Sequence, residues 1–333
     1  MKKFTPLFIL VFAYCSLSFA QDIHYSQFYS SPLSLNPALT GINDCNYRVG
    51  VMYRNQWKSV SIPYKTPSIS FDINNVLPKI IKSGILSLGV IVINDQAGEG
   101  ALTNLSILGS IAYQHGFADN KFNLSLGVQG GYVQKRIDPS KLTFETQFNG
   151  TSFDPALSNG ENIDDKFGYA DFNAGIYLSY SPTHAVDIFL GDAQSHLTTP
   201  KETFLSGTND LHLRTTIHGG LRIGVTDKLS IIPQALYLMQ SKARETNLGL
   251  GLAYAFTPDV HLYAGVYDRI KDAIIPQIGF EYKRVRLGLS YDINTSSLHN
   301  IASGNSAFEI SLMYTGCLGN ITLDQPVMFC PRY

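Results

Sequence analysis

The sequence predicts a transmembrane, antiparallel β-barrel of about fourteen strands with an N-terminal segment before it. Three observations lead to this fold class. The chain starts with an export signal, its later segments alternate apolar and polar residues, and no apolar run is long enough for a membrane-spanning helix. In lipid, only helices and closed barrels satisfy every backbone polar group. If the chain spans a membrane, it therefore does so as a barrel.

Residues 1–20 have the three parts of a secretory signal peptide. Two lysines give a positive start, residues 4–17 are mostly apolar, and Ser18 and Ala20 put small side chains where signal peptidase cleaves. The apolar stretch is too short for a membrane anchor, and no stop-transfer charges follow it. We expect cleavage after Ala20.

The composition suits contact with lipid and excludes several function classes. The chain has 25 Lys and Arg against 26 Asp and Glu, a formal net charge of −1 at pH 7. This balance argues against a nucleic-acid binder and against a polybasic membrane-surface protein. Charged residues make up only 15%, compared with about 25% in typical soluble domains, while Tyr and Phe occur 19 times each.

From Arg48 onward, apolar side chains occupy every second position. In residues 285–294, aliphatic and aromatic side chains alternate with small and polar ones, as in a strand with two unlike faces. The longest nearly uninterrupted apolar run after the signal is 85–93, well short of the ~20 residues that a spanning helix needs. The predicted strands are 48–57, 68–74, 84–94, 102–115, 122–135, 169–180, 185–191, 213–224, 229–240, 244–256, 260–269, 273–282, 285–294 and 306–315.

Strand and loop lengths favour a barrel over a soluble β-sandwich, in which the apolar face would point inward. Most predicted strands have about ten to thirteen residues, whereas soluble strands have about 5–6 and barrel strands about 9–11. The long connections 136–168, 192–212 and 295–305 all follow odd-numbered strands. Outer-membrane barrels have long outer loops and short periplasmic turns. We therefore expect a multi-pass barrel over residues 47–316 in the cell outer membrane, with both termini periplasmic.

Two prolines fit this pattern poorly. Pro233 and Pro276 fall inside predicted strands, where proline cannot donate a ladder hydrogen bond. We expect either bulges at these positions or strand boundaries different from those predicted.

The segments on either side of the barrel lack strand periodicity. Residues 21–46 are polar and aromatic, and are expected to be a periplasmic segment, a plug in the lumen or a disordered lead. Residues 317–333 are expected to form a periplasmic tail. Cys45, Cys317 and Cys330 remain after signal cleavage, all on the periplasmic side where disulfides form. A bond between Cys317 and Cys330 is the first choice because the loop is short, although sequence alone does not fix the pairing.

No motif for catalysis, metal binding or cofactor binding is found in the sequence. The eight His residues show neither H-x-H nor H-E-x-x-H spacing, and no G-x-S-x-G nucleophile motif occurs. Glycine-rich residues 127–131 lie within a strand, which favours close backbone packing over phosphate binding. Ser195, His196 and Asp192 are near one another in sequence, but a catalytic triad depends on geometry. We therefore expect no enzymatic activity, cofactor or metal.

Three motifs near the N-terminus have no generic structural reason to occur together. They are residues 21–29 (QDIHYSQFY), Leu35-Asn36-Pro37-Ala38 with Gly41, and Tyr53-Arg54-Asn55-Gln56-Trp57. Together they resemble the signature of the PorP/SprF family, outer-membrane proteins of the type IX secretion system and gliding machinery. The similarity continues along essentially the whole mature chain, for example at residues 289–293 and 308–311.

The resemblance implies a non-enzymatic barrel that assists the secretion and surface attachment of a specific large partner, such as an adhesin, and that contacts periplasmic secretion components. The candidate partner-binding residues are Tyr25, Gln27, Phe28, Tyr29, Asn36, Pro37, Arg54, Gln56 and Trp57. Aromatic side chains often dominate interfaces, but these could equally seal the inner end of the barrel. The alternative function is a passive porin or small-solute channel, which predicts a wide polar lumen and no obligate partner.

Overall fold

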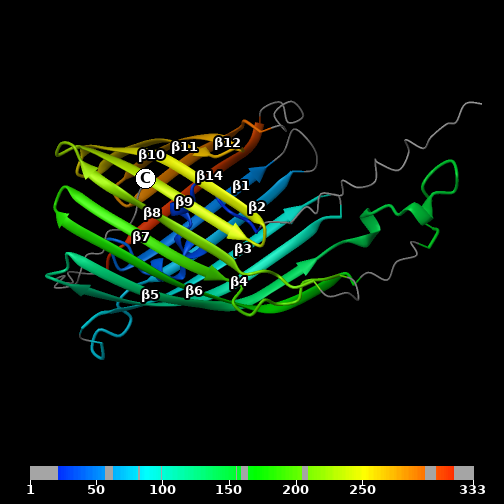
Figure 1. Ribbon diagram of the computed structural model, residues 1–333, viewed down its shortest axis with the longest axis horizontal. Coiled ribbons are helices and arrows are strands. Elements are labelled where there is room, and N and C mark those ends of the chain that lie inside the picture. Colours follow the sequence, from blue (N-terminus) through cyan, green and yellow to red (C-terminus); the bar gives the residue numbers. More distant parts are fainter. Residues whose placement is uncertain are drawn as a thin grey trace, which may run out of the picture.

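The computed structural model describes residues 22–56, 63–81, 83–98, 100–154, 156–158, 164–204, 209–296 and 305–318. Within these residues, fourteen strands form one closed antiparallel barrel, as predicted (Figure 1). The expected signal peptide, Trp57, Cys330 and nearly all of the expected C-terminal tail lie outside the described residues.

Each strand pairs with its neighbours along the chain, and the last strand pairs with the first. The largest differences from the predicted bounds are at β2, which starts earlier, and at β6 and β7, which are longer. The strands are β1 (Tyr47–Gln56), β2 (Tyr64–Ile73), β3 (Ile85–Ala97), β4 (Leu102–Phe117), β5 (Phe122–Arg136), β6 (Lys166–Thr183), β7 (Val186–Ser195), β8 (Arg214–Gly224), β9 (Leu229–Gln240), β10 (Ala243–Thr257), β11 (Val260–Arg269), β12 (Ala273–Tyr282), β13 (Val285–Asn294) and β14 (Asn305–Gly316).

The outer face of the barrel is apolar, whereas the inner face is mostly polar with some apolar side chains. Val266 and Ile278 on the outer face are 56% and 61% exposed, whereas Asp292 and Glu309 on the inner face are fully buried. A soluble sandwich would show the opposite arrangement, with apolar side chains inside. No helix in the described part of the chain has the length and apolar character to cross a membrane.

The strands continue through Pro233 and Pro276 without a bulge. Pro233 pairs with Leu250 of β10, and Pro276 pairs with Val266 of β11. On their other sides, β8 and β13 skip the pairing at the proline but keep the same register before and after it. Each proline therefore interrupts the ladder on one side only, and neither bulges nor displaced boundaries are needed.

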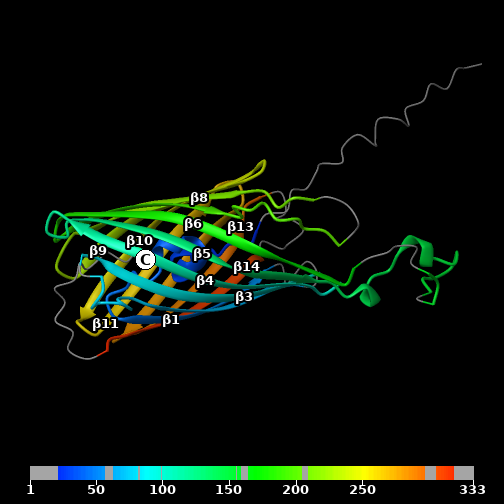
Figure 2. The same ribbon diagram turned by 90° about the horizontal axis from the view of Figure 1, so that it is seen from below.

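Residues 22–46 run through the interior of the barrel, one of the three placements considered above. They contain three short helices, η1 (Phe28–Ser30), α1 (Pro32–Leu35) and η2 (Pro37–Leu39). The segment is drawn in blue inside the ring of strands in Figures 1 and 2. Helix η2 packs against β4, β5 and β6. We call residues 22–46 the luminal segment.

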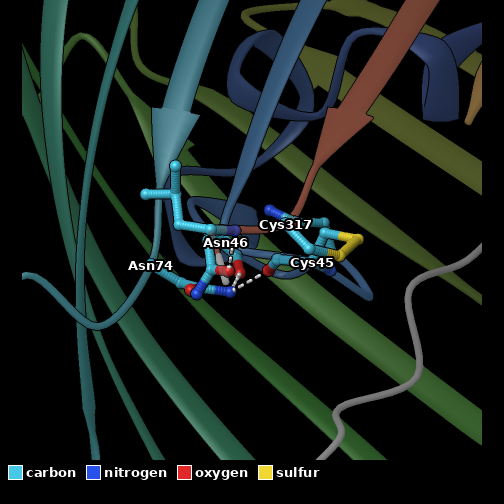
Figure 3. Close-up of a disulfide and its surroundings, with 7 residues drawn as sticks. Cys45, Asn46, Asn74 and Cys317 are labelled. Carbon is cyan, nitrogen blue, oxygen red and sulfur yellow. Dashed lines mark hydrogen bonds between the residues drawn. A yellow bond between two sulfur atoms is a disulfide. The ribbon is translucent and has the colours of Figure 1, made fainter. Parts of the chain in front are cut away.

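A disulfide joins Cys45 to Cys317 at the seam where β1 and β14 close the barrel (Figure 3). Cys45 precedes β1 and Cys317 follows β14. Next to the disulfide, the backbone N–H of Asn46 donates to the carbonyl oxygen of Gly316 (3.0 Å). The predicted bond between Cys317 and Cys330 is therefore wrong. Barrel closure brings together two cysteines 272 positions apart, which an argument from short loop length does not consider.

We expect peptide mapping without reductant to recover a linked peptide pair containing Cys45 and Cys317. Replacing both cysteines with Ser should lower the unfolding temperature in detergent by several degrees, since losing a native disulfide typically costs about 2–4 kcal/mol. The matched control, Cys330→Ser, should leave both the linked peptide and the unfolding temperature unchanged. Loss of the linkage in that control would contradict the observed pairing.

Candidate functional site: the lumen and its segment

The luminal segment is held at one end of the barrel by Arg48 of β1 and Asp72 of β2. The two side chains form a two-point ion pair, with Arg48 Nε 2.9 Å from Asp72 Oδ1 and Nη2 2.7 Å from Oδ2. Arg48 also donates to the carbonyl oxygens of Leu39 and Ile42, and Asp72 accepts the backbone N–H of Gly41 at 2.6 Å. The arginine of this ion pair thus binds backbone carbonyl groups of the segment, and the aspartate binds a backbone N–H group.

Gly41 is required at this contact for two reasons. Its φ of +73° lies in the left-handed region, which disfavours residues with a Cβ. A Cβ would also lie 2.2 Å from the hydroxyl oxygen of Ser87. The glycine of the N-terminal signature therefore has a physical role in turning the segment toward β1.

The middle of the segment is fixed by Asn36, which is fully buried. Its side-chain oxygen caps η2 by accepting the N–H of Ala38 (2.9 Å), and its amide nitrogen donates to the carbonyl oxygens of Ile176 (3.0 Å) and Asp192 (3.2 Å). The same nitrogen lies 3.1 Å from Nε2 of His218. A single amide thereby ties the segment to β6, β7 and β8.

Glycines on the inner face make room for this turn. A Cβ at Gly175 would lie 2.0 Å from Oδ1 of Asn36, and one at Gly127 would lie 2.4 Å from the backbone of Pro37 and Ala38. The sequence predicts close backbone packing at the glycines of residues 127–131, and Gly127 has that role. The backbone that approaches it belongs to the luminal segment.

A cluster of two cations and two carboxylates surrounds Ser26 in the lumen. Glu309 accepts two consecutive backbone N–H groups, those of Ser26 (2.7 Å) and Gln27 (2.8 Å). The Ser26 hydroxyl donates to Asp292 and accepts hydrogen bonds from Arg54 (2.8 Å) and Arg269 (2.6 Å).

The charges of this cluster balance within the barrel wall. Arg54 pairs with both Asp292 and Glu309, and Arg269 pairs with Asp292 at 3.1 Å. All four side chains are at most 4% exposed. Removing one member of such a buried cluster leaves an uncompensated charge, which is strongly destabilising.

Aromatic packing complements these polar contacts. The ring of Phe28 meets that of Tyr267 edge-on with centroids 5.9 Å apart, and the ring of Tyr29 meets that of Phe189 at 5.8 Å. The Tyr29 hydroxyl lies 3.2 Å from Nδ1 of His218. Edge-on pairs at these distances are favourable, so Phe28 packs against the wall at β11 and Tyr29 packs against it at β7.

The segment crosses the barrel from one end to the other. Asp22 contacts His196 beyond the end of β7 and Gln240 at the end of β9, which is the end with the long loops. Cys45 lies at the opposite end, where β1 begins. We call these the loop end and the turn end. The expectation that both chain termini share the periplasmic end is therefore wrong for residue 22, because the segment passes through the lumen before β1 starts.

Most candidate partner-binding residues lie inside the barrel. The structure brings together, in contact with the luminal segment or within it, Tyr25, Gln27, Phe28, Tyr29, Asn36, Pro37 and Arg54, all of them buried. Gln56 is half-buried at the loop end, where its side-chain oxygen accepts from Arg54 at 3.3 Å. In this conformation these buried residues join the luminal segment to the wall, and a role in binding a partner stays a prediction.

Sequence reasoning missed most of the wall residues that hold the segment: Arg48, Asp72, Arg269, Asp292 and Glu309. Each is a charged or polar residue on the inner face of a predicted strand. The available signal was the presence of full charges at inward positions of strands that are otherwise small and polar. The pairing of these inward charges depends on how the barrel closes. The alternation of residues along each strand does not predict that closure.

Ser195, His196 and Asp192 do not form a catalytic triad. The Asp192 carboxylate accepts from Gln194 (3.2 Å), and Ser195 Oγ accepts from Arg214 (3.4 Å). Within the described part of the chain, no group of three His, Cys, Asp or Glu side chains is arranged to hold a metal ion.

His196 lies instead between two carboxylates at the loop end. Its Nε2 is 2.5 Å from Asp22 and its Nδ1 is 3.0 Å from Asp171. Burial disfavours the charged imidazole, but these two hydrogen bonds raise the pKa of His196 to about 9. Burial would raise the pKa of Asp22, yet the hydrogen bond from His196 and the charge of Arg214 lower it below its usual range.

These shifts predict a pH window for the attachment of the segment's first residues. A raised histidine pKa stabilises the contact fully below about pH 6.5, and the effect is lost as the pH rises through about 9. The lowered pKa of Asp22 stabilises it above about pH 4, with loss only in stronger acid. The ion pair therefore holds at neutral pH and weakens toward pH 10.

A nitroxide on Ile23→Cys, in a Cys330→Ser background, should be immobile at pH 7 and mobile at pH 10 by electron paramagnetic resonance. In the matched variant His196→Gln, the label should be mobile at pH 7 and change little with pH. A label that stays immobile at pH 10 in the protein with His196 would refute the role of this ion pair.

Comparison with solved structures identifies the same kind of barrel. The fold matches the "CymD monoaromatic hydrocarbon channel" with a TM-score of 0.52 and 12% identity over 87% of this chain and 93% of that one. A Pseudomonas aeruginosa FadL homologue matches with a TM-score of 0.48 and 12% identity over 84% and 92% of the two chains. The NanC porin matches with 0.41 and 9% identity over 82% and 100%. At these identities, the first match shows the fold alone.

A search of curated proteins found no match. The sequence matches one family over residues 17–314, nearly the whole chain, and that family is described as "Type IX secretion system membrane protein PorP/SprF". The described barrel, with its apolar outer face, is an outer-membrane barrel. The chain belongs to the PorP/SprF family of type IX secretion system membrane proteins.

Proposed function

We propose that this protein is a non-enzymatic component of the type IX secretion and gliding system that assists the secretion and surface attachment of one partner, such as an adhesin. The observation that carries the proposal is the occupied lumen. A barrel that serves as an attachment platform needs no open channel, whereas a porin does. Family membership supplies the link to secretion.

The contacts of the luminal segment support a closed lumen. They occur along its whole length, from Asp22 at the loop end through Ser26 and Asn36 to Gly41 at the turn end. Cavities lined by the segment measure about 80, 240 and 30 Å³. Cavities of this size hold a few waters or one small molecule and do not form a continuous channel for solutes.

The passive porin is the weaker candidate. It predicted a wide polar lumen, and the wall residues that would line it are engaged by the segment instead. The similarity to CymD, a hydrocarbon channel, concerns the fold and does not transfer a substrate.

The two ends of the barrel suit two kinds of partner. Long connections between β5 and β6 and between β7 and β8 lie at the loop end, which we expect to face the cell surface because outer-membrane barrels have their long loops there. We propose that this end receives the exported partner, since long irregular loops are where binding usually resides. The turn end then faces the periplasmic components of the secretion system.

Replacing Tyr25, Phe28 and Tyr29 with Ala should open an ion leak in planar lipid bilayers. The three side chains are 4–6% exposed, and truncating a buried aromatic costs about 3–5 kcal/mol of packing. The same change at Tyr254, Phe256 and Phe280 on the lipid face is the matched control and should produce no leak. If the luminal variant stays closed yet display of the partner is lost, the aromatics serve docking rather than sealing.

Deleting the gene should abolish the surface display of one specific partner and leave the other surface proteins in place. Quantitative proteomics of cells shaved with protease measures this, with complementation by the intact gene as the control. If the deletion strain displays every surface protein normally but loses uptake of a small solute, the secretion role is wrong and the porin role replaces it.

A further inference from the structure

The connection between β5 and β6 ends in a small, ordered hairpin. Phe148 and Phe153 face each other in an isolated bridge, and the backbone N–H of Asp154 donates to the carbonyl oxygen of Gln147 (2.8 Å). At the turn, the Asn149 side chain accepts from the backbone of Ser152 at 2.9 Å. The tip is therefore held by its own hydrogen bonds.

This hairpin projects from a fixed base. In Figures 1 and 2 the loop extends well beyond the ends of the strands, away from the ring. Its base is joined to the neighbouring connection, where the N–H of Asp164 donates to Phe204 (3.1 Å) and the rings of Phe167 and Phe204 meet edge-on at 4.6 Å. The tip thus stands in water, beyond the lipid-facing band on the strands.

The hairpin carries apolar side chains that nothing in the described residues covers. Phe148 and Phe153 are 49% and 53% exposed with ring centroids 5.3 Å apart, and Leu157 nearby is 41% exposed. Exposed apolar side chains on the barrel wall face lipid, but these do not. Grouped, exposed aromatics away from lipid are typical of a protein-binding surface.

The negative charge of the sequence around the tip indicates which kind of partner surface can bind there. From position 142 to 165 the sequence has five acidic residues and no Lys or Arg. Two of them, Glu145 and Asp154, belong to the hairpin that carries the aromatic pair. An acidic surface repels anionic lipid headgroups and attracts a basic protein face.

We propose that Phe148 and Phe153, with Glu145 and Asp154 beside them, form a docking tip for a protein at the cell surface. The partner presents an apolar groove that accepts the two rings, bordered by Lys or Arg. The proposal rests on the proposed function in one respect, since the partner is taken to be the exported protein.

Photo-crosslinking in intact cells tests the tip directly. p-Benzoylphenylalanine at position 148 should give one protein adduct on irradiation, whereas the same probe at Ser140, near the base of the same loop, should give none. The double reversal Glu145→Lys and Asp154→Lys should reduce the adduct at least fivefold. An adduct with lipopolysaccharide or with the barrel itself, an adduct insensitive to charge reversal, or no adduct would overturn the proposal.

A second variant separates this proposal from the proposed function. Phe148→Ser with Phe153→Ser should lower the amount of displayed partner at least fivefold, with barrel abundance and heat-dependent gel mobility unchanged. Leu197→Ser, which changes a similarly exposed side chain (47%) in another loop, is the matched control and should have no effect. Normal display of the partner by the double variant overturns the docking-tip proposal alone. Normal display of the partner by the deletion strain overturns the proposed function.

Discussion

The pairing of β1 with β14 is the constraint on which the rest of the structure depends. In lipid, an open sheet edge would leave a row of unpaired N–H and C=O groups, so the sheet must close. Ten residue pairs join the two strands, from Tyr47↔Gly316 to Gln56↔Ala307. The Cys45–Cys317 disulfide lies directly beside the first pair. Because Cys45 also lies near the end of the luminal segment, the disulfide that secures the seam also fixes the point where the segment leaves the lumen.

Closure creates a polar interior that must then be satisfied. Strands of this barrel place Arg54, Arg269, Asp292 and Glu309 on the inner face, where an empty channel would hydrate them. Here the backbone and hydroxyl of Ser26 take the place of water, with Glu309 accepting two N–H groups that no helix or sheet satisfies. The polar groups of the segment and those of the wall therefore satisfy one another's hydrogen bonds. These bonds explain why a 25-residue stretch with little regular structure is ordered.

The fold was predictable from sequence, but the site was not. Period-two alternation is a local property, so all fourteen strands could be located, and their even number and lengths indicated a barrel. The placement of residues 22–46 depends on contacts such as Asn36 with Ile176, 140 positions apart. No local pattern encodes such pairs. The prediction of the disulfide was wrong for the same reason. Proximity in sequence favoured Cys330 as the partner of Cys317, whereas closure of the sheet brings Cys45 to it. The signature motifs mark residues whose observed contacts join the luminal segment to the barrel wall, and their role in binding a partner stays a prediction.

The contact between the luminal segment and the wall is partly polar and partly apolar, and the two parts respond differently to water. An apolar plug would expose its own core and that of the wall on leaving, and both would resist hydration. This interface has both kinds of contact: hydrogen bonds from the wall hold Ser26, Asn36 and Gly41, and apolar side chains of the segment pack with wall side chains in two buried clusters. If the segment withdrew, the pairs between Arg54, Asp292 and Glu309 would remain within the wall, because all three belong to strands. Water can then replace the segment at these polar sites, whereas withdrawal would expose the apolar clusters to water. The polar contacts therefore set where the segment sits, and the apolar contacts favour the closed lumen.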